Sequence, residues 1–216
     1  MGSLKEKVLA LLLLIAGLLM VKYLGVKFPY KFCIIIGFVL LATWLQDGNL
    51  KRLNFKKIGW ADIRIILICY LALELLMDFV VQPLISFLLK EPADYSAFDS
   101  IRGNSVMYFS FLWKMWISAA VGEELFFRGF VFAQGRRLTG DNKIVLIILS
   151  AVLFAVPHLY QGTSGLLVTF VFGLAFAWMY ARYQHIWINI IVHGLIDTVF
   201  LTLSYYGLTG FYTLSF

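Results

Sequence analysis

The sequence contains few charged side chains. Lys, Arg, Asp and Glu together make up 14% of its 216 residues, whereas 62% are hydrophobic. Soluble globular domains carry charges on about 25% of their residues. This scarcity of charge excludes an ordinary soluble domain, and apolar runs along almost the whole length indicate an integral membrane protein.

Cysteine is also scarce, which limits the kinds of cross-link and metal site that the chain can form. Its two cysteines, Cys33 and Cys69, both lie in apolar stretches, where a thiol behaves as a small hydrophobe. We therefore expect neither a disulfide nor a cysteine-ligated metal.

Seven apolar stretches follow one another, and a membrane-spanning helix needs roughly 20 such residues. They predict an all-α polytopic bundle of about seven helices, forming one integral membrane domain over residues 1–216. The tail over residues 205–216 is too short to cross a bilayer, so it is either an interfacial piece or the start of an eighth element. The seven stretches cover residues 8–21, 32–45, 65–89, 106–132, 144–156, 165–180 and 186–203.

The basic residues predict the orientation in a cell membrane. The net charge of +6 is spread over short loops rather than gathered in one patch, so we expect contact with membrane lipids and none with nucleic acid. If the N-terminus is cytoplasmic, eleven basic residues fall in cytoplasmic segments and five on the other side, as the positive-inside rule favours. The eleven are Lys5, Lys7, Lys51, Arg52, Lys56, Lys57, Arg64, Arg136, Arg137, Lys143 and Arg182; the five are Lys22, Lys27, Lys31, Lys90 and Arg102.

Ionisable residues inside the apolar stretches need a partner or a function, because each costs about 2.5–3.5 kcal/mol to insert. The fourth stretch holds Glu123, Glu124 and Arg128. Residues four apart share a helical face, so Glu124 and Arg128 are expected to form a neutralised ion pair. Glu123 points about 100° away and has no local partner.

Two of the three histidines fall late in separate apolar stretches, at His158 and His193. A lone buried histidine is usually a satisfied core residue, but a helical bundle can bring both rings and Glu123 to one cavity. Pro157 removes a helical hydrogen bond beside His158 and so opens the backbone there. Phe154 lies one turn before His158, where its ring would limit rotation of the imidazole by packing.

Further polar residues share helical faces in two places. Asp197 lies four residues after His193 and would either orient that imidazole or face the cavity beside it. Glu74 and Asp78 in the third stretch line a proton path, bind an ion, or serve as inward-facing structural groups bonded to Arg102, Lys114 or hydroxyls. We favour the structural interpretation. The third histidine, His185, is expected at the membrane interface.

Three short patterns occur in order: EELFFR over residues 123–128, FAVPH over 154–158 and HGLID over 193–197. Together they resemble EExxxR, FxxxH and HxxxN/D, the motifs of the CPBP family of intramembrane proteases. That family groups type II CAAX prenyl endopeptidases with bacteriocin-processing and self-immunity proteins. The resemblance covers about residues 113–203, and the helices over residues 106–203 would be the catalytic core.

The resemblance implies a conical cavity that opens toward the cytoplasm, and hydrolysis of peptide bonds in or near the membrane. Glu123 would activate water with the help of His158, while His193 and Asp197 would stabilise the oxyanion. Glu124, Arg128 and Phe154 would support them. A hydrophobic or lipidated peptide or protein would suit such a cavity as substrate.

One departure from the family pattern concerns Asp197, where many members have asparagine. An asparagine amide donates a hydrogen bond to an oxyanion, whereas an ionised aspartate cannot. Asp197 is therefore either protonated or orients His193. Zinc bound by His158, His193 and either Glu123 or Asp197 is a further alternative. A metal would occupy the glutamate that is needed as base, and we favour a metal-free reaction.

Two other functions use the same residues. A self-immunity or partner-binding protein would keep the fold and the polar cluster without turnover. A transporter would use the carboxylates and histidines as a proton relay, although no inverted repeat is found in the sequence.

Overall fold

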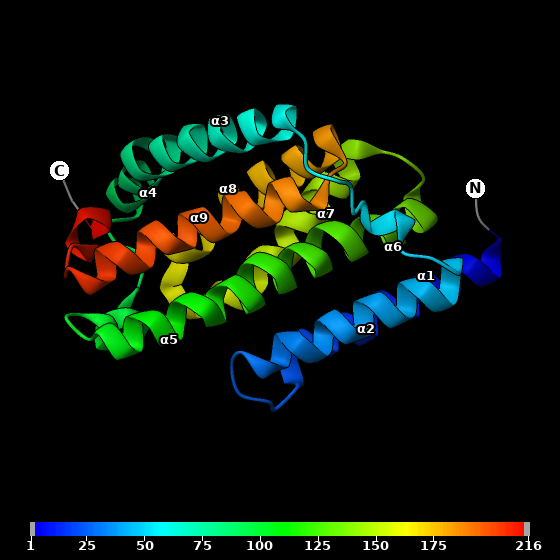
Figure 1. Cartoon of the computed structure of the whole chain (residues 1–216), viewed down its shortest axis with the longest axis horizontal. Helices are drawn as coiled ribbons and strands as arrows, with labels where there is room; N and C mark the ends of the chain where they lie inside the picture. Colours follow the sequence, from blue (N-terminus) through cyan, green and yellow to red (C-terminus); the bar gives the residue numbers. More distant parts are fainter. Residues whose placement is uncertain (1–2, 214–216) are drawn as a thin grey trace.

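The computed structural model describes residues 3–213, and all regular elements in that part of the chain are helical (Figure 1). Some neighbouring elements run on as one helix, so the described residues form seven long helices: α1, α2, α3–η2–α4, α5–η4–α6, α7, α8 and α9. The bounds are α1 (Leu4–Tyr23), α2 (Tyr30–Asp47), η1 (Lys51–Leu53), α3 (Trp60–Leu76), η2 (Met77–Val81), α4 (Gln82–Leu89), η3 (Ser96–Ile101), α5 (Ser105–Met115), η4 (Trp116–Phe130), α6 (Val131–Thr139), α7 (Lys143–Ala155), η5 (Val156–Gln161), α8 (Gly162–Tyr183), α9 (Ile186–Tyr205) and η6 (Thr209–Thr213).

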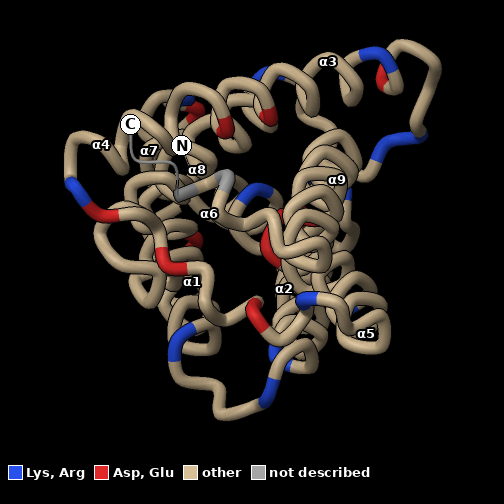
Figure 2. The backbone as a smooth tube through the Cα atoms, turned by 90° about the vertical axis from the view of Figure 1, so that its left-hand side faces the viewer, with Lys and Arg blue, Asp and Glu red and all other residues tan. Residues whose placement is uncertain are grey.

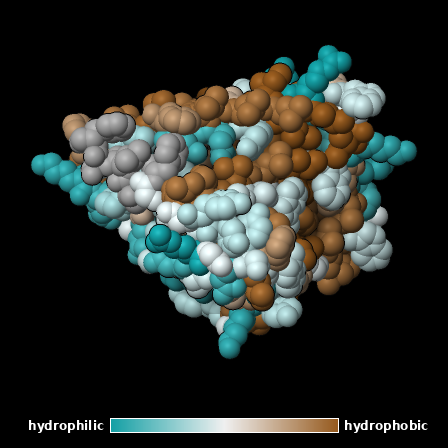
Figure 3. Space-filling view, turned by 60° about the vertical axis from the view of Figure 1, so that its left-hand side comes forward, coloured by the Kyte–Doolittle hydropathy of each residue, from teal (hydrophilic) through white to brown (hydrophobic). Residues whose placement is uncertain are grey.

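The prediction of an all-α polytopic membrane protein is confirmed. Each predicted apolar stretch lies in a helix, and many large apolar side chains are exposed on the outside of the bundle, as a lipid-facing surface requires. Figure 3 shows broad apolar areas on the face that it displays. By length and composition, four helical stretches of the described chain can cross a membrane: Tyr30–Asp47, Trp60–Leu89, Lys143–Tyr183 and Ile186–Tyr205.

The long stretch Lys143–Tyr183 contains a reversal of direction. The 3₁₀ helix η5 follows α7, and Gly162 then takes a positive φ of 76°, which a residue with a side chain rarely adopts. α8 returns along α7 so closely that a Cβ at Gly173 would lie 3.0 Å from Ala151 Cα. The stretch is therefore a helical hairpin rather than one long span.

The loops gather at two opposite ends of the bundle, and the start of α1 and the end of α9 lie at different ends (Figure 1). The connections α2–α3, α6–α7 and α8–α9 lie at the end where α1 begins, and we call it the basic end. There, Asn54 Nδ2 donates to Tyr180 Oη at 2.9 Å and Arg136 Nη2 donates to Gln184 Oε1 at 2.7 Å. At the other end, which we call the mouth end, backbone hydrogen bonds join Asp94 to Gln161 and Gly103 to Tyr205. The predicted tail contributes only the short helix η6 within the described residues.

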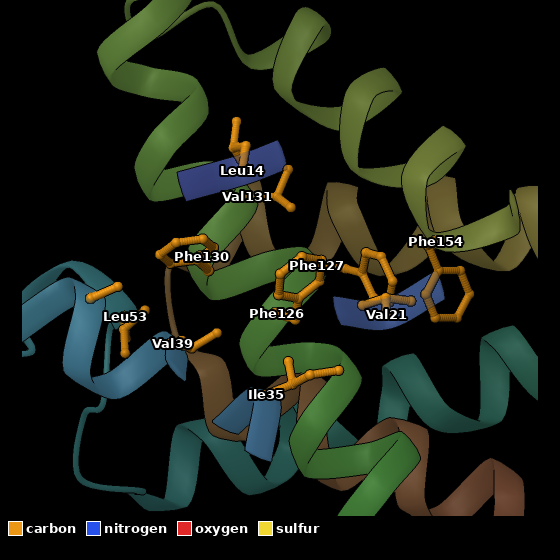
Figure 4. Packing of buried hydrophobic residues seen from close by; sticks show 11 residues of the cluster. Leu14, Val21, Ile35, Val39, Leu53, Phe126, Phe127, Phe130, Val131 and Phe154 are labelled. Atoms are coloured by element: carbon orange, nitrogen blue, oxygen red, sulfur yellow. The ribbon is translucent and has the colours of Figure 1, made fainter. Parts of the chain in front are cut away.

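Aromatic packing around η4 positions this helix in the bundle (Figure 4). Phe126, Phe127 and Phe130 are 1% exposed or less and pack against α1 and α2. Lipid tails are as apolar as these side chains, so the association of the helices depends on close packing rather than on escape from water. Gly17 of α1 permits that packing, because a Cβ there would overlap the ring of Phe126.

Candidate active site

Glu124 lies at the centre of a buried hydrogen-bond network. Its Oε1 accepts from Arg128 Nη1 at 2.8 Å, so the ion pair expected from the sequence is present, and neither side chain is exposed. The same oxygen lies 2.8 Å from His193 Nδ1. A carboxylate paired with arginine accepts hydrogen bonds, so Nδ1 of this imidazole carries a proton. Glu124 therefore orients His193, a contact that sequence spacing did not predict.

Aromatic rings surround the cation and the imidazole of this network. The Arg128 guanidinium carbon lies 4.0 Å from the ring centroid of Phe154 and 5.1 Å from that of Phe176. Arg128 Nε and Nη2 have no hydrogen-bond partner among the described residues, and the nearby ring faces attract the cation in addition to its pairing with Glu124. The His193 ring stacks on Phe176 at 4.9 Å, which fixes its plane.

Asn189 is a member of the network that the sequence analysis missed. It is fully buried on α9, and its Nδ2 donates to Glu124 Oε2 at 3.2 Å and to the Phe176 carbonyl at 2.8 Å. It lies one helical turn before His193. A buried amide on the same face as a functional histidine was the signal that could have revealed it.

Glu123, in contrast, makes no hydrogen bond or ion pair with the described residues, and it lines a cavity of about 960 Å³. His158, His193 and Asp197 line the same cavity. The three elements η4, η5 and α9 thus bring these four predicted side chains to one space, although they come from three separate parts of the sequence.

His158 lies in η5, where the predicted interruption by Pro157 is present. Its Nδ1 lies 3.0 Å from the carbonyl oxygen of Phe154. A carbonyl only accepts, so Nδ1 carries the proton and Nε2 presents a lone pair. The Phe154 ring packs 5.3 Å from the imidazole, as expected from the spacing.

Asp197 is close to His193 but not hydrogen-bonded to it. The distance from His193 Nε2 to Asp197 Oδ2 is 3.7 Å, which is too long for a hydrogen bond. Oδ2 is buried and has no hydrogen-bond partner among the described residues. The side chain therefore has an acceptor available at the cavity wall.

The third-span carboxylates line the cavity, but the expected partners were wrong. Asp78 accepts from Gln82 Nε2 at 3.0 Å, and Gln82 Oε1 accepts from Tyr95 at 2.7 Å. Neither Arg102 nor Lys114 makes a hydrogen bond or ion pair with Asp78 or Glu74. His185 is the N-cap residue of α9 at the basic end and is only 3% exposed, with Nε2 3.8 Å from Asp62 Oδ2; its position at the membrane interface stays a prediction.

The zinc alternative requires three ligands around one point. Among residues 3–213, no group of three His, Cys, Asp or Glu side chains is arranged to hold a metal ion. The proposed set of His158, His193 and Glu123 lines one cavity without forming such a group.

The cavity reaches the surface at the mouth end of the bundle. Its exposed lining residues include Phe28 before α2, Ala97 in η3 and Leu159 in η5. The N-terminal helix begins at the opposite end (Figure 1). A cytoplasmic N-terminus and a cavity open to the cytoplasm were both expected from the sequence, and they exclude each other in this fold.

Part of the chain matches a known protein family. Residues 105–199, which are 95 of the 216 residues, match the family described as type II CAAX prenyl endopeptidase Rce1-like. The matched segment contains Glu123, His158, His193 and Asp197. No curated protein and no solved structure matches the chain.

Proposed function

We propose, on the premise that residues 105–199 form a domain of the Rce1-like family of type II CAAX prenyl endopeptidases, that this membrane protein is an intramembrane endopeptidase. Its substrate is a membrane-associated peptide or protein, and the attacking group is a water molecule activated by Glu123 and His158. All proposed catalytic residues belong to the helices of residues 106–203.

One observation carries this proposal, namely the different surroundings of two adjacent glutamates. The Glu124 carboxylate accepts hydrogen bonds from Arg128, His193 and Asn189. Glu123 has no such partner and faces the cavity. A general base needs a free lone pair within reach of water, and Glu123 is the glutamate that satisfies this requirement.

The reaction then follows from the orientation of each group. Glu123 accepts a proton from water as the water oxygen attacks the peptide carbonyl carbon. His158 accepts a hydrogen bond from the other O–H of this water at Nε2, because its Nδ1 donates to the Phe154 carbonyl. His193, protonated on both ring nitrogens beside the Asp197 carboxylate, donates from Nε2 to the oxyanion. As the intermediate collapses, Glu123 passes the proton that it took from water to the leaving amine.

The cavity wall suits a hydrophobic or lipidated segment. It is built largely of apolar and aromatic side chains, including Phe32, Phe98, Phe111 and Phe172. A peptide in lipid satisfies its backbone by forming a helix, so the bond to be cut must be unwound where water is present. A cavity with an apolar wall and a cluster of carboxylates and imidazoles meets both requirements.

Comparative peptidomics tests the proposal. Membranes with the wild-type chain are expected to accumulate peptide fragments that are absent from membranes with Glu123→Gln, Glu123→Ala or His158→Ala at equal protein levels. If immunity or processing survives all three substitutions, the chain is a binding protein. Ion flux into vesicles without any fragments would instead identify a transporter.

A further inference from the structure

The basic residues and the cavity mouth lie at opposite ends of the molecule. Eleven of the eighteen Lys and Arg residues belong to the N-terminal segment and to the loops of the basic end, whereas five lie at the mouth end. Loops rich in Lys and Arg remain in the cytoplasm when a chain inserts into a membrane. The charge distribution therefore places the basic end in the cytoplasm and the mouth on the other side.

The basic end is closed by packing and hydrogen bonds. Phe130, Tyr180 and Ile186 lie between the site and this end, and none of them is exposed. Hydrogen bonds also join the loops of this end: Asn54 in the α2–α3 connection bonds to Tyr180 and Gln184, and Gln184 in the α8–α9 connection bonds to Arg136. None of the eleven basic residues of this end lines the cavity. The cavity that Glu123 lines therefore does not reach the surface at this end.

The mouth end is open. Figure 2 views the backbone from this end, with the helices arranged around the interior. Exposed cavity-lining residues come from the segment before α2, from η3 and from η5, all of which belong to this end. Lys22 and Lys31 lie on the α1–α2 side of the wall, and Glu74 and Asp78 lie on the third helix.

We propose that the cavity opens on the extracytoplasmic face and that the substrate is a polypeptide segment that reaches it from there. The substrate part of this inference rests on the proposed function, whereas the direction of the opening rests on the fold and the charges alone. The cleaved bond then lies in the extracytoplasmic part of a membrane-associated peptide, or in a peptide exported across the membrane. A segment presented only in the cytoplasm is not a substrate.

Cysteine labelling tests the direction of the opening. The full chain is expressed with Cys33→Ala and Cys69→Ala, and single cysteines are then introduced as Ala97→Cys at the mouth or as the matched loop variant Asp141→Cys at the basic end. Both positions are exposed, and neither substitution changes the count of basic residues. A membrane-impermeant maleimide should label Ala97→Cys in intact cells and should label Asp141→Cys only after permeabilisation.

Protection of Ala97→Cys in intact cells, or labelling of Asp141→Cys there, would overturn the inference, provided that both thiols react after denaturation. The same pair in a Glu123→Gln background should give the same labelling. The direction is thereby tested even if the protein hydrolyses nothing.

The substrate part has its own readout. Cleavage sites that depend on Glu123 are mapped onto the precursor sequences, and they should lie in extracytoplasmic or exported segments. Sites confined to cytoplasmic segments would overturn the substrate part. Identical fragments from wild type and Glu123→Gln would instead refute the proposed hydrolysis while leaving the labelling result unchanged.

Discussion

At the scale of single residues, Glu123 is distinguished by having no hydrogen-bond partner in the described part of the chain. Glu123→Gln keeps its shape and removes its ability to accept a proton. We expect the rate of peptide hydrolysis to fall by about 10²–10⁴-fold, the usual contribution of general acid–base catalysis. The unfolding temperature should be unchanged, because no hydrogen bond is lost. Fragment formation per unit of protein and thermal unfolding in detergent measure the two effects.

Glu6→Gln is the matched control for this substitution. Glu6 closes the capping box of α1 with Ser3, and glutamine fills that role equally well. It should retain wild-type hydrolysis and stability. Equal loss of hydrolysis in both variants would contradict a special role for Glu123.

The pair of Glu124 and Arg128 predicts a difference between single and double substitutions. Arg128→Met leaves the Glu124 carboxylate buried without its cation, which should lower the free energy of unfolding by about 3–5 kcal/mol. The double variant Glu124→Gln with Arg128→Met leaves no uncompensated charge and should lose less. Chemical unfolding in detergent distinguishes them, and equal losses would show that the pair is not coupled.

Asn189 should tolerate loss of its amide better than conversion to a carboxylate. Asn189→Asp directs an acceptor at two other acceptors, the Glu124 carboxylate and the Phe176 carbonyl. Asn189→Leu only removes the donor, at a cost of about 1–3 kcal/mol. We expect the aspartate variant to unfold at the lower temperature. Asn142→Asp, at a helix N-cap where both residues cap well, is the control and should change little.

The sequence predicted contacts within one helix but not those between helices. Spacing of four residues was sufficient for Glu124 with Arg128 and for Phe154 with His158. The bonds from His193 and Asn189 to Glu124 join residues that are more than sixty positions apart in the chain. They depend on how α9 packs against η4, which periodicity alone does not define. Asp78 is an exception, because its observed partner Gln82 lies four residues later on the same helix, where spacing alone could have predicted the contact.

At the scale of elements, glycines allow the helices of the site to approach each other. A Cβ at Gly194 would lie 2.6 Å from the ring of Trp116, which must then shift. Gly194→Ala should therefore destabilise the protein by about 1–3 kcal/mol through overpacking. Gly37→Ala is the matched control, because nothing lies within 4 Å of its Cβ and alanine favours a helix. Thermal unfolding should show opposite shifts, and equal shifts would contradict this view of the packing.

Two helices deviate from regular α geometry beside the site. Pro157 predicted the interruption at η5, because proline cannot donate the helical hydrogen bond. The π-helical hydrogen bonding of η4 had no such signal, since its sequence contains no proline. Departures of this kind often occur at functional sites. They depend on packing against the surrounding helices, so the sequence of one helix does not predict them.

At the scale of the whole molecule, the fold class and all seven helices followed from the apolar stretches. The bilayer permits few other ways to satisfy a backbone. The direction of the cavity did not follow. Charge counting and family resemblance gave opposite expectations, and only the positions of the loops relative to the cavity lining made the conflict visible.

Hydrolysis by water that Glu123 activates is tested most directly by isotopic labelling of the products. Membranes with the wild-type chain or with Glu123→Gln are incubated in water enriched in oxygen-18, and the peptides released are analysed by mass spectrometry. We predict fragments from the wild-type membranes alone, each with one heavy oxygen in its new C-terminal carboxylate. Labelled fragments at the same level from both membranes would contradict the role of Glu123, and fragments without the heavy oxygen would contradict attack by water.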